Sequence, residues 1–232
     1  MNEAMDRTAM LLGENAVLKL NNSSVLIVGL GGVGSYASEA VARSFVGNIS
    51  LCDHDIVSAS NINRQLCALT STIGKLKTEV VAKRILDINP NCNVKTFTRF
   101  FDETSANDIL SEKYDYIIDA IDSVDSKVHL IKMAHDAEIP IISALGTGNK
   151  LNPMLFQITE IEKTSVCPLA RVMRRKLKDA GIKKHKVLFS TEQPVMTTLP
   201  KSGEHPVPGS VSFVPSCAGL MLAGFVVKSL IV

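Results

Sequence analysis

The chain has 232 residues, of which 46% are hydrophobic, and it carries a formal net charge of +2. This size suits one globular unit, and the near-neutral charge excludes a chain that is basic or acidic throughout. The five cysteines are widely separated and include no C-x-x-C pair, which argues against a disulfide framework and a structural zinc site. Residues 1–21 include charged side chains and no long apolar run, so we expect no secretory signal and a cytoplasmic protein.

Residues 5–20 carry apolar side chains at helical spacing, and we expect Gly13 to divide this stretch in two. Arg7 lies near its start. The pattern alone favours a solvent-exposed arginine at a helix end.

The segment 24–34 predicts an anion-binding turn. A continuous apolar run at 25–28 is typical of a strand that is buried on both faces. It leads into Gly-Leu-Gly-Gly-Val-Gly at 29–34, and helical spacing follows. Glycines let the backbone approach a phosphate, and a helix N-terminus offers free N–H groups. The glycines that we expect to line a nucleotide are Gly29, Gly31, Gly32 and Gly34.

The next strand and loop add polar groups to this turn. A second strand is predicted at 49–52, and Asp53 follows it where dinucleotide folds hold the ribose hydroxyl groups. That spacing suits NAD and ATP equally. The loop beyond it contains Asn61, Arg64 and Gln65, and an arginine fork suits phosphate oxygens. Because charge builds on the phosphates as ATP is cleaved, the loop favours ATP over a nicotinamide cofactor.

A helix predicted at 75–89 has Lys75 and Lys77 in its first turn, where positive charge opposes the helix dipole. This placement favours a phosphate contact for one of them, and a solvated lysine is the alternative.

Further strands at 94–100, 116–120 and 141–144 alternate with helical segments, the clearest of which is 126–138. A short helix is expected within the polar stretch 102–113. The alternation predicts a doubly wound, mostly parallel, Rossmann-like α/β sheet with helices on both faces.

Two aspartates flank the end of the strand at 116–120. Asp119 precedes that end and Asp122 follows it, so one is expected to be structural while the other faces a ligand. Asp122 is the better candidate for a magnesium ligand, because it lies beyond the strand.

After residue 150 the pattern changes. Residues 154–161 alternate as in an edge or antiparallel strand, and 167–180 predict a basic helix. Within 171–186 there are eight Lys or Arg residues and one Asp. This asymmetry predicts a footprint for RNA or another anionic ligand, and a solvated helix face is the alternative. The residues proposed to contact this ligand are Arg171, Arg174, Arg175, Lys178, Lys183 and Lys184.

The last segments are a proline-rich stretch at 191–209, a short strand at 210–214 and a closing helix at 218–232. The proline-rich stretch is expected to be a mobile loop. The closing helix contains Lys228 and is shorter than the ~20 residues that a membrane span needs. We therefore expect a buried helix and no membrane contact. Together these features predict a single domain, 1–232, with a nucleotide-binding core at 24–150 and an extension at 151–232.

Several motifs resemble the ubiquitin-activating-enzyme-like ThiF/MoeB/HesA superfamily. They are the glycine turn, Asp53-His54-Asp55 through Ser60-Asn61-Ile62-Asn63-Arg64-Gln65, Gly74-x-x-Lys77, and Asp119-Ala120-Ile121-Asp122-Ser123. Within that superfamily, segments 63–66, 70–74 and 163–171 are similar to the branch of tRNA threonylcarbamoyladenosine dehydratases.

The resemblance implies an ATP site and a homodimer. The glycines would line the ATP, and Asp53 would hold its ribose. The triphosphate would be gripped by Ser60, Asn61, Arg64 and Lys77. The other residues counted as ATP-binding are Asp55, Gln65, Asp122 and Ser123. Asp122 would ligate Mg²⁺ with Ser123 beside it, and Arg7 would reach across the dimer to the partner's phosphates. The implied catalytic residues are therefore Arg64, Lys77, Asp122 and Arg7.

The implied reaction is ATP-dependent dehydration of threonylcarbamoyladenosine in tRNA, beside the anticodon, through an acyl adenylate. A sulfur-transfer partner protein is also conceivable. The alternative is an adenylating enzyme for the C-terminus of a ubiquitin-like or sulfur-carrier protein. Members of that kind often carry paired C-x-x-C motifs and a transfer cysteine, and this chain lacks the motifs. Cys167 and Cys217 are formal thiol candidates, although a buried, inert role is favoured. A nicotinamide oxidoreductase and a nonenzymatic RNA-binding module are weaker alternatives.

Overall fold

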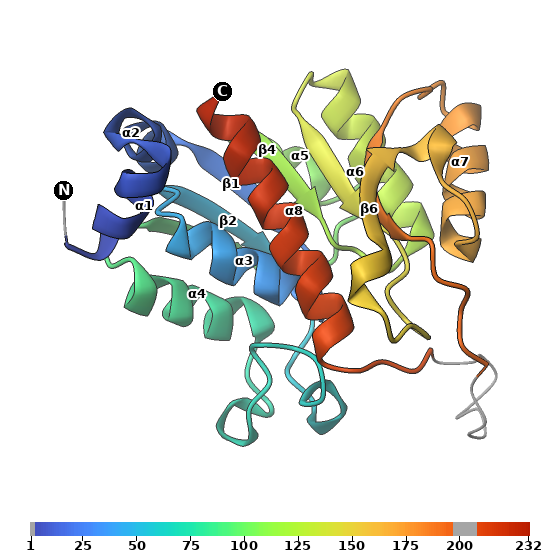
Figure 1. Ribbon diagram of the computed structural model, residues 1–232, viewed down its shortest axis with the longest axis horizontal. Coiled ribbons are helices and arrows are strands. Elements are labelled where there is room, and N and C mark those ends of the chain that lie inside the picture. The colour runs from blue at the N-terminus through green and yellow to red at the C-terminus, as the bar shows by residue number, and fades with distance from the viewer. Residues whose placement is uncertain (1–2, 197–207) are drawn as a thin grey trace.

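A seven-stranded sheet forms the centre of the protein in the computed structural model, which describes residues 3–196 and 208–232 (Figure 1). The strand order is β3-β2-β1-β4-β5-β7-β6. Neighbouring strands are parallel except for the antiparallel pair β6–β7. The strands are β1 (Ser24–Val28), β2 (Asn48–Cys52), β3 (Asn93–Phe97), β4 (Tyr116–Asp119), β5 (Ile141–Ala144), β6 (Phe156–Glu160) and β7 (Lys186–Ser190). The predicted doubly wound, mostly parallel α/β fold with an antiparallel addition is confirmed.

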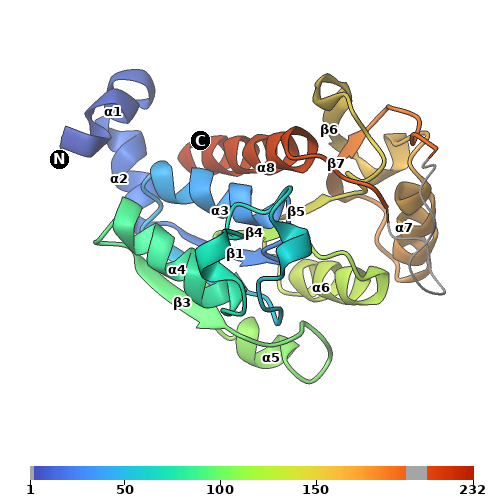
Figure 2. The same ribbon diagram turned by 90° about the horizontal axis from the view of Figure 1, so that it is seen from below.

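Helices cover both faces of the sheet (Figure 2). They are α1 (Asp6–Leu12), α2 (Glu14–Asn22), α3 (Gly34–Arg43), α4 (Lys77–Ile88), α5 (Ala106–Ile109), α6 (Val124–Asp136), α7 (Pro168–Asp179) and α8 (Phe213–Ile231). Side chains of α2, α3, α4 and α8 join one buried cluster, and those of α5, α6 and α7 join the other. The sheet is therefore the middle of three layers.

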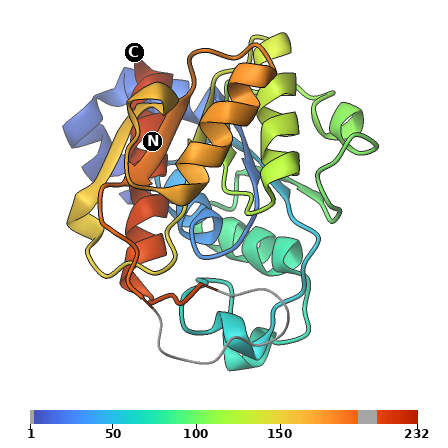
Figure 3. The same cartoon turned by 90° about the vertical axis from the view of Figure 1, so that its right-hand side faces the viewer.

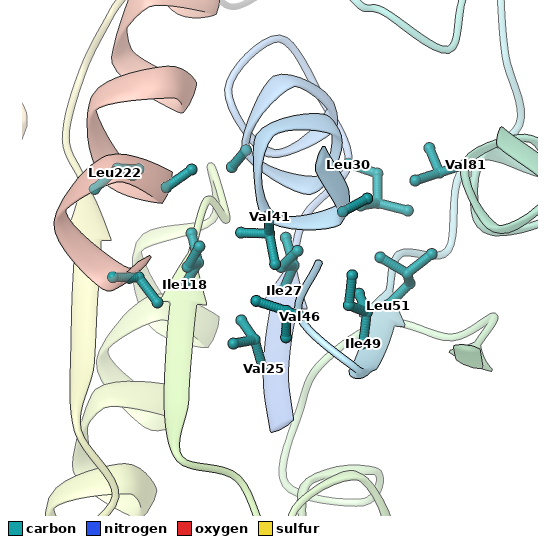
Figure 4. Close-up of a cluster of buried hydrophobic side chains, with 14 of the residues drawn as sticks. Val25, Ile27, Leu30, Val41, Val46, Ile49, Leu51, Val81, Ile118 and Leu222 are labelled. Carbon is teal, nitrogen blue, oxygen red and sulfur yellow. The ribbon is translucent and has the colours of Figure 1, made fainter. Parts of the chain in front are cut away.

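The first cluster shows how β1 is buried (Figure 4). Val25 and Ile27 point to the face that carries α3 and α8, where they belong to the same buried cluster as Val41 and Leu222. Leu26 and Val28 belong to the cluster on the opposite face. All of these are at most 2% exposed, which confirms that the continuous apolar run is a strand buried on both sides.

The strand register aligns the carboxyl ends of the central strands. Val28 of β1 pairs with Cys52 of β2 on one side and with Asp119 of β4 on the other. The residues that follow these strands therefore meet along one edge of the sheet, where ligands of open α/β folds bind.

Gly13 divides the N-terminal helical stretch as predicted. It has φ of 88°, a value that L side chains rarely adopt, and it separates α1 from α2. The described side chains of α1 are not buried within this chain.

One prediction about the C-terminal part is wrong, and one strand was missed. Residues 210–214 do not form a strand, because α8 already begins at Phe213 and accommodates Pro215 in its first turn. Proline is tolerated there because its missing N–H would have no helical partner. The strand β7 was not predicted at all.

Of the predicted mobile loop 191–209, residues 197–207 lie outside the described part. The described part before this gap is held by backbone hydrogen bonds, in which Thr191 N–H donates to Leu155 O and Val195 N–H donates to Asn149 O.

Helix α8 is long and apolar enough to cross a membrane by length and composition alone. One face of the helix nevertheless enters the first core cluster, and the helix lies against α3 (Figure 1). The buried side chains of this face are Val214, Ala218, Leu222, Ala223, Val226 and Val227. This is the arrangement of a core helix, as the prediction of a buried closing helix requires.

Candidate nucleotide site

A cavity of about 650 Å³ lies at the carboxyl ends of β1, β2, β4 and β5. Most of the residues proposed from the sequence to bind ATP line it. They are Gly29, Gly31, Gly32, Asp53, Asp55, Asn61, Arg64, Gln65, Lys77 and Asp122. The proposed residues Gly34, Ser60 and Ser123 do not line it.

The glycine turn is closely packed at two of its positions. Gly29 has φ of 88°, and a Cβ there would lie 2.6 Å from the carbonyl oxygen of Ala120. A Cβ on Gly34 would lie 1.7 Å from the carbonyl oxygen of Gly29. A Cβ on Gly31, in contrast, would meet only Gln65 Nε2 at 3.9 Å. Gly29 and Gly34 are therefore required by the fold, whereas Gly31 leaves room on the cavity side for a ligand to approach the backbone.

Asp53 fastens the end of β2 to the glycine turn. It is 8% exposed, and its Oδ2 accepts the Leu30 N–H at 2.6 Å. Its Oδ1 accepts the Asp55 N–H at 2.8 Å. A carboxylate can accept about four hydrogen bonds, so these two contacts leave capacity for hydroxyl groups of a ligand.

Lys77 and Arg64 supply positive charge to the cavity. Lys77 is the first residue of α4 and only 4% exposed, and its Nζ lies 2.6 Å from Asp55 Oδ2. Lys75 lies before the helix and is exposed, so the predicted phosphate contact falls to Lys77 of the two. Arg64 donates from Nη1 to Ser60 O and to Asn63 Oδ1, both at 2.9 Å. These contacts position the guanidinium. Its Nε and Nη2 have no hydrogen-bond acceptor among the described residues and can therefore donate to a ligand.

The two aspartates at the end of β4 have separate environments, as expected. Asp119 is fully buried, and Lys127 Nζ lies 2.8 Å from both of its carboxylate oxygens. Asp122 is exposed and lines the cavity. Its carboxylate has no hydrogen-bond or ion-pair partner within residues 3–196 and 208–232, so its oxygens are free to bind a ligand. A second group of possible ligands, Asp53, His54 and Asp55, has ligand atoms within 4.8 Å of one another. Asp55 is already paired with Lys77, whereas the Asp122 carboxylate is unpaired among the described residues.

Arg7 lies on α1 and does not line the cavity of its own chain. It is exposed within one chain, and α1 lies at the margin of the molecule near the N-terminus (Figure 1).

Some cationic side chains of the basic segment 171–186 have partners within the chain, and others have none among the described residues. Arg174 donates to the carbonyl oxygen and the hydroxyl of Thr164, and Lys176 pairs with Asp125 at 2.6 Å. The cations that are exposed, without a partner among the described residues, are Arg171, Arg175, Lys178, Lys183 and Lys184. Helix α7, orange in Figure 3, stands at the outer end of the molecule beside the yellow-green α6.

The cavity also includes residues that the sequence did not reveal. Arg99 and Phe100 line it from the loop after β3, and Thr147 and Lys150 line it from the loop after β5. The general rule that ligands lie beyond the carboxyl ends of parallel strands could have identified them, because each follows such a strand.

Three of the buried thiols are poor nucleophiles. Burial raises the pKa of Cys52, which lines the cavity, to about 12. Burial also raises the pKa of Cys67 and of Cys92 to about 11. Because the thiolate is the reactive form, these groups remain protonated at neutral pH. Cys167 is buried at the N-terminus of α7 and lines the cavity, whereas Cys217 lies half-buried on α8.

The fold and the cavity define a nucleotide-binding protein of the doubly wound α/β class. The sequence profile of the ThiF family matches residues 5–231. The tRNA threonylcarbamoyladenosine dehydratase of Bacillus subtilis (strain 168) is 42% identical, over 97% of this chain and 93% of its own. The chain therefore belongs to the ThiF family.

Solved structures agree with this assignment. The structure of TcdA (CsdL) has a TM-score of 0.91 and 34% identity, covering 98% of this chain and 94% of its own. The Escherichia coli tRNA N6-threonylcarbamoyladenosine dehydratase in complex with ATP has a TM-score of 0.89 and 34% identity, covering 98% and 93%. A more distant relative, the adenylyltransferase and sulfurtransferase UBA4 of Saccharomyces cerevisiae (strain RM11-1a), is 36% identical over 57% of this chain and 30% of its own.

Proposed function

We propose that this chain is an ATP-dependent tRNA threonylcarbamoyladenosine dehydratase, which cyclises the modified nucleoside next to the anticodon. The observation that carries the proposal is the match to dehydratases over nearly the whole chain, together with a cavity that joins the glycine turn to Arg64, Lys77 and Asp122. The distant match to an adenylyltransferase and sulfurtransferase keeps adenylation of a carrier protein as the alternative.

The chemistry begins with activation of a carboxylate, which is a poor electrophile because oxide is a poor leaving group. Attack of the substrate carboxylate on the α-phosphate gives an acyl adenylate and releases pyrophosphate. Arg64 and Lys77 are placed to stabilise the charge that develops on the phosphates. Mg²⁺ bound by Asp122 would neutralise further phosphate charge.

Ring closure then needs no protein nucleophile. A nitrogen or oxygen of the substrate's own carbamoyl group attacks the activated carbonyl, and AMP leaves. Because both groups belong to one molecule, their proximity replaces a second binding event. The raised pKa of the buried Cys52 in the cavity is consistent with a mechanism that uses no thiol.

The direct test is to incubate the purified protein with ATP and tRNA that carries threonylcarbamoyladenosine, and to analyse nucleosides by mass spectrometry. We expect AMP, pyrophosphate and a nucleoside lighter by one water. Arg64→Ala should lower kcat by about 10²–10³, as loss of one charge-stabilising donor does. Arg84→Ala is the matched control, because Arg84 pairs with Glu39 outside the cavity. Unchanged nucleoside combined with adenylation of a carrier protein would establish the alternative.

We also propose that the protein works as a homodimer in which Arg7 serves the partner's site. Helix α1 buries none of its described side chains, and Met10 and Leu11 beside Arg7 are each 84% exposed. Such a surface suits a second copy of the chain. In the dimer, Arg7 would contact the phosphates bound by the partner. Its guanidinium has no partner among the described residues of its own chain.

Mixing two inactive variants tests this arrangement. Arg7→Ala and Arg64→Ala should each be inactive alone. In a mixed dimer one site keeps both arginines, so random mixing should restore about a quarter of the wild-type activity. Activity that stays absent after demonstrated subunit exchange would show that Arg7 does not act across the interface.

The substrate RNA is proposed to lie against the exposed cations on and after α7. Five unpaired positive charges on one outer surface would neutralise phosphates in a salt-dependent manner. A tRNA-modifying enzyme of this kind is expected in the cytoplasm, and a sulfur-transfer partner protein remains part of the proposal without a contact surface assigned to it.

A further inference from the structure

We propose that Lys150 binds the carboxylate of the substrate and holds it against the nucleotide, an inference that rests on the proposed function. Lys150 lies in the loop after β5, lines the cavity, and is only 4% exposed. No role was assigned to it from the sequence.

The side chain carries a buried charge with few partners. Its Nζ donates to the carbonyl oxygen of Glu192 at 2.7 Å. The Glu192 carboxylate instead accepts the N–H groups of Leu151 and Asn152, at 2.9 and 3.0 Å. Within residues 3–196 and 208–232, no carboxylate oxygen lies within 4.0 Å of Lys150 Nζ. An ammonium has three donors, so two of them remain for an anion in the cavity.

The loop that carries Lys150 is held firmly. The N–H of Asn149 donates to Gly209 O at 2.8 Å, and the Asn149 side chain accepts the Gly209 N–H at 2.6 Å. A Cβ on Gly148 would lie 2.7 Å from Pro208 Cβ. These contacts on both sides of the loop fix the position of the ammonium, and a fixed donor is what orientation of a reacting group requires.

The strand order places this cation on the acyl side of the cavity. Along the sheet edge, Asp53 follows β2, the glycine turn follows β1, Asp122 follows β4 and Lys150 follows β5. A nucleotide with its ribose at Asp53 and its phosphates over the turn leaves the β5 end for the group that attacks the α-phosphate. That group is an ionised carboxylate approaching a polyanion. A cation beside it offsets their repulsion and distinguishes the substrate from an unmodified adenosine.

The test compares two ligands that differ in one charge. An anticodon stem-loop that carries threonylcarbamoyladenosine is measured beside its methyl ester, with the full-length protein. The wild type should bind the acid about tenfold or more tightly than the ester, as expected for a hydrogen bond to a charged group. Lys150→Gln keeps a donor for the Glu192 carbonyl and removes the charge, so the preference should fall to near one. Lys150→Arg should retain part of it, and Lys132→Gln, which removes a surface charge on α6, should retain all of it.

The outcomes separate the inference from the proposed function. If the wild type does not convert the modified nucleoside, the proposed function fails. If it converts the nucleoside while folded Lys150→Gln keeps the acid preference, only the role of Lys150 fails. Loss of ATP affinity in folded Lys150→Gln would assign the ammonium to the nucleotide and overturn the inference. Should Lys150→Gln not fold, the wild-type ratio decides alone, and a ratio near one refutes a carboxylate-binding cation.

Discussion

The buried ion pair of Lys127 and Asp119 gives a sharp test of the packing beneath the site. Both side chains are completely buried, and the ammonium lies 2.8 Å from each carboxylate oxygen. Removing one partner of such a pair leaves an uncompensated buried charge, which typically costs about 3–5 kcal/mol. Lys127→Met keeps a similar volume, so we expect a loss of that size. This is a large part of the roughly 5–15 kcal/mol that stabilises an ordinary domain.

The same helix provides a matched control. Lys132 pairs with Asp136 one turn away on α6, and both side chains are more than half exposed. An exposed pair at this spacing contributes about 0.3–0.5 kcal/mol, so Lys132→Met should be nearly neutral. Urea unfolding of both variants and the wild type gives the free energies by linear extrapolation, provided that the m-values agree.

A double variant separates the charge from the packing. Lys127→Met combined with Asp119→Leu removes both charges, which should recover much of the lost stability. The recovery should fall short by about 1–3 kcal/mol, because the N–H of Ile121 then loses its acceptor Asp119 Oδ1. If Lys127→Met costs no more than Lys132→Met, the pair does not stabilise this end of the sheet and the reasoning is refuted.

Three further predictions concern the turn, a buried histidine and the basic surface. Gly34→Ala should abolish ATP binding measured by calorimetry, because its Cβ would lie 1.7 Å from a backbone carbonyl oxygen; wild-type affinity would contradict this packing. Burial, and then the charges of His135 and Lys127, lower the pKa of His185 to about 3 from 6.5. Between these two pH values the unfolded chain therefore binds more protons, so the free energy of unfolding falls as pH falls, by up to about 1.4 kcal/mol per pH unit. His185→Gln should lose stability less steeply on acidification, as measured by urea unfolding at a series of pH values. An unchanged slope would refute this role of His185. Reversing the charge of Arg175 should weaken tRNA binding in filter assays by several-fold and lower its salt dependence, whereas equal affinity would indicate a merely solvated surface.

Sequence patterns were sufficient for the parallel core because its signals are local. The apolar run of β1, the glycine turn and Asp53 are adjacent in the chain, and each has a direct structural reason. Strand β7 was not predicted from the sequence because only three of its residues, 187–189, are apolar, and they follow a dense basic segment. Its place between β5 and β6 is a long-range pairing that no local pattern specifies.

The site could be predicted where it depends on the ends of parallel strands, and not where it depends on packing between loops. Asp122 follows this rule, and Lys77 was indicated by its place in the first turn of a helix. The significance of Lys150 appears only once segments 192–195 and 208–209 close around its loop. The same holds for Arg174, whose place in the basic run gives no sign that Thr164 binds it.

The strand order explains how one cavity can bring together a common reaction and a particular substrate. The proposed ribose and phosphate contacts come from the ends of β2 and β1 and from α4, all before residue 89, whereas the proposed acyl side comes from β5 and from segments after residue 145. These two sets touch at β4, where Asp122 faces the cavity and the buried Asp119–Lys127 pair fixes the strand end. A change in the later segments can therefore alter which carboxylate is accepted while leaving ATP binding intact, and a change at β4 should disturb both. Measuring ATP affinity and acid-against-ester preference in the same variants distinguishes these two classes of effect.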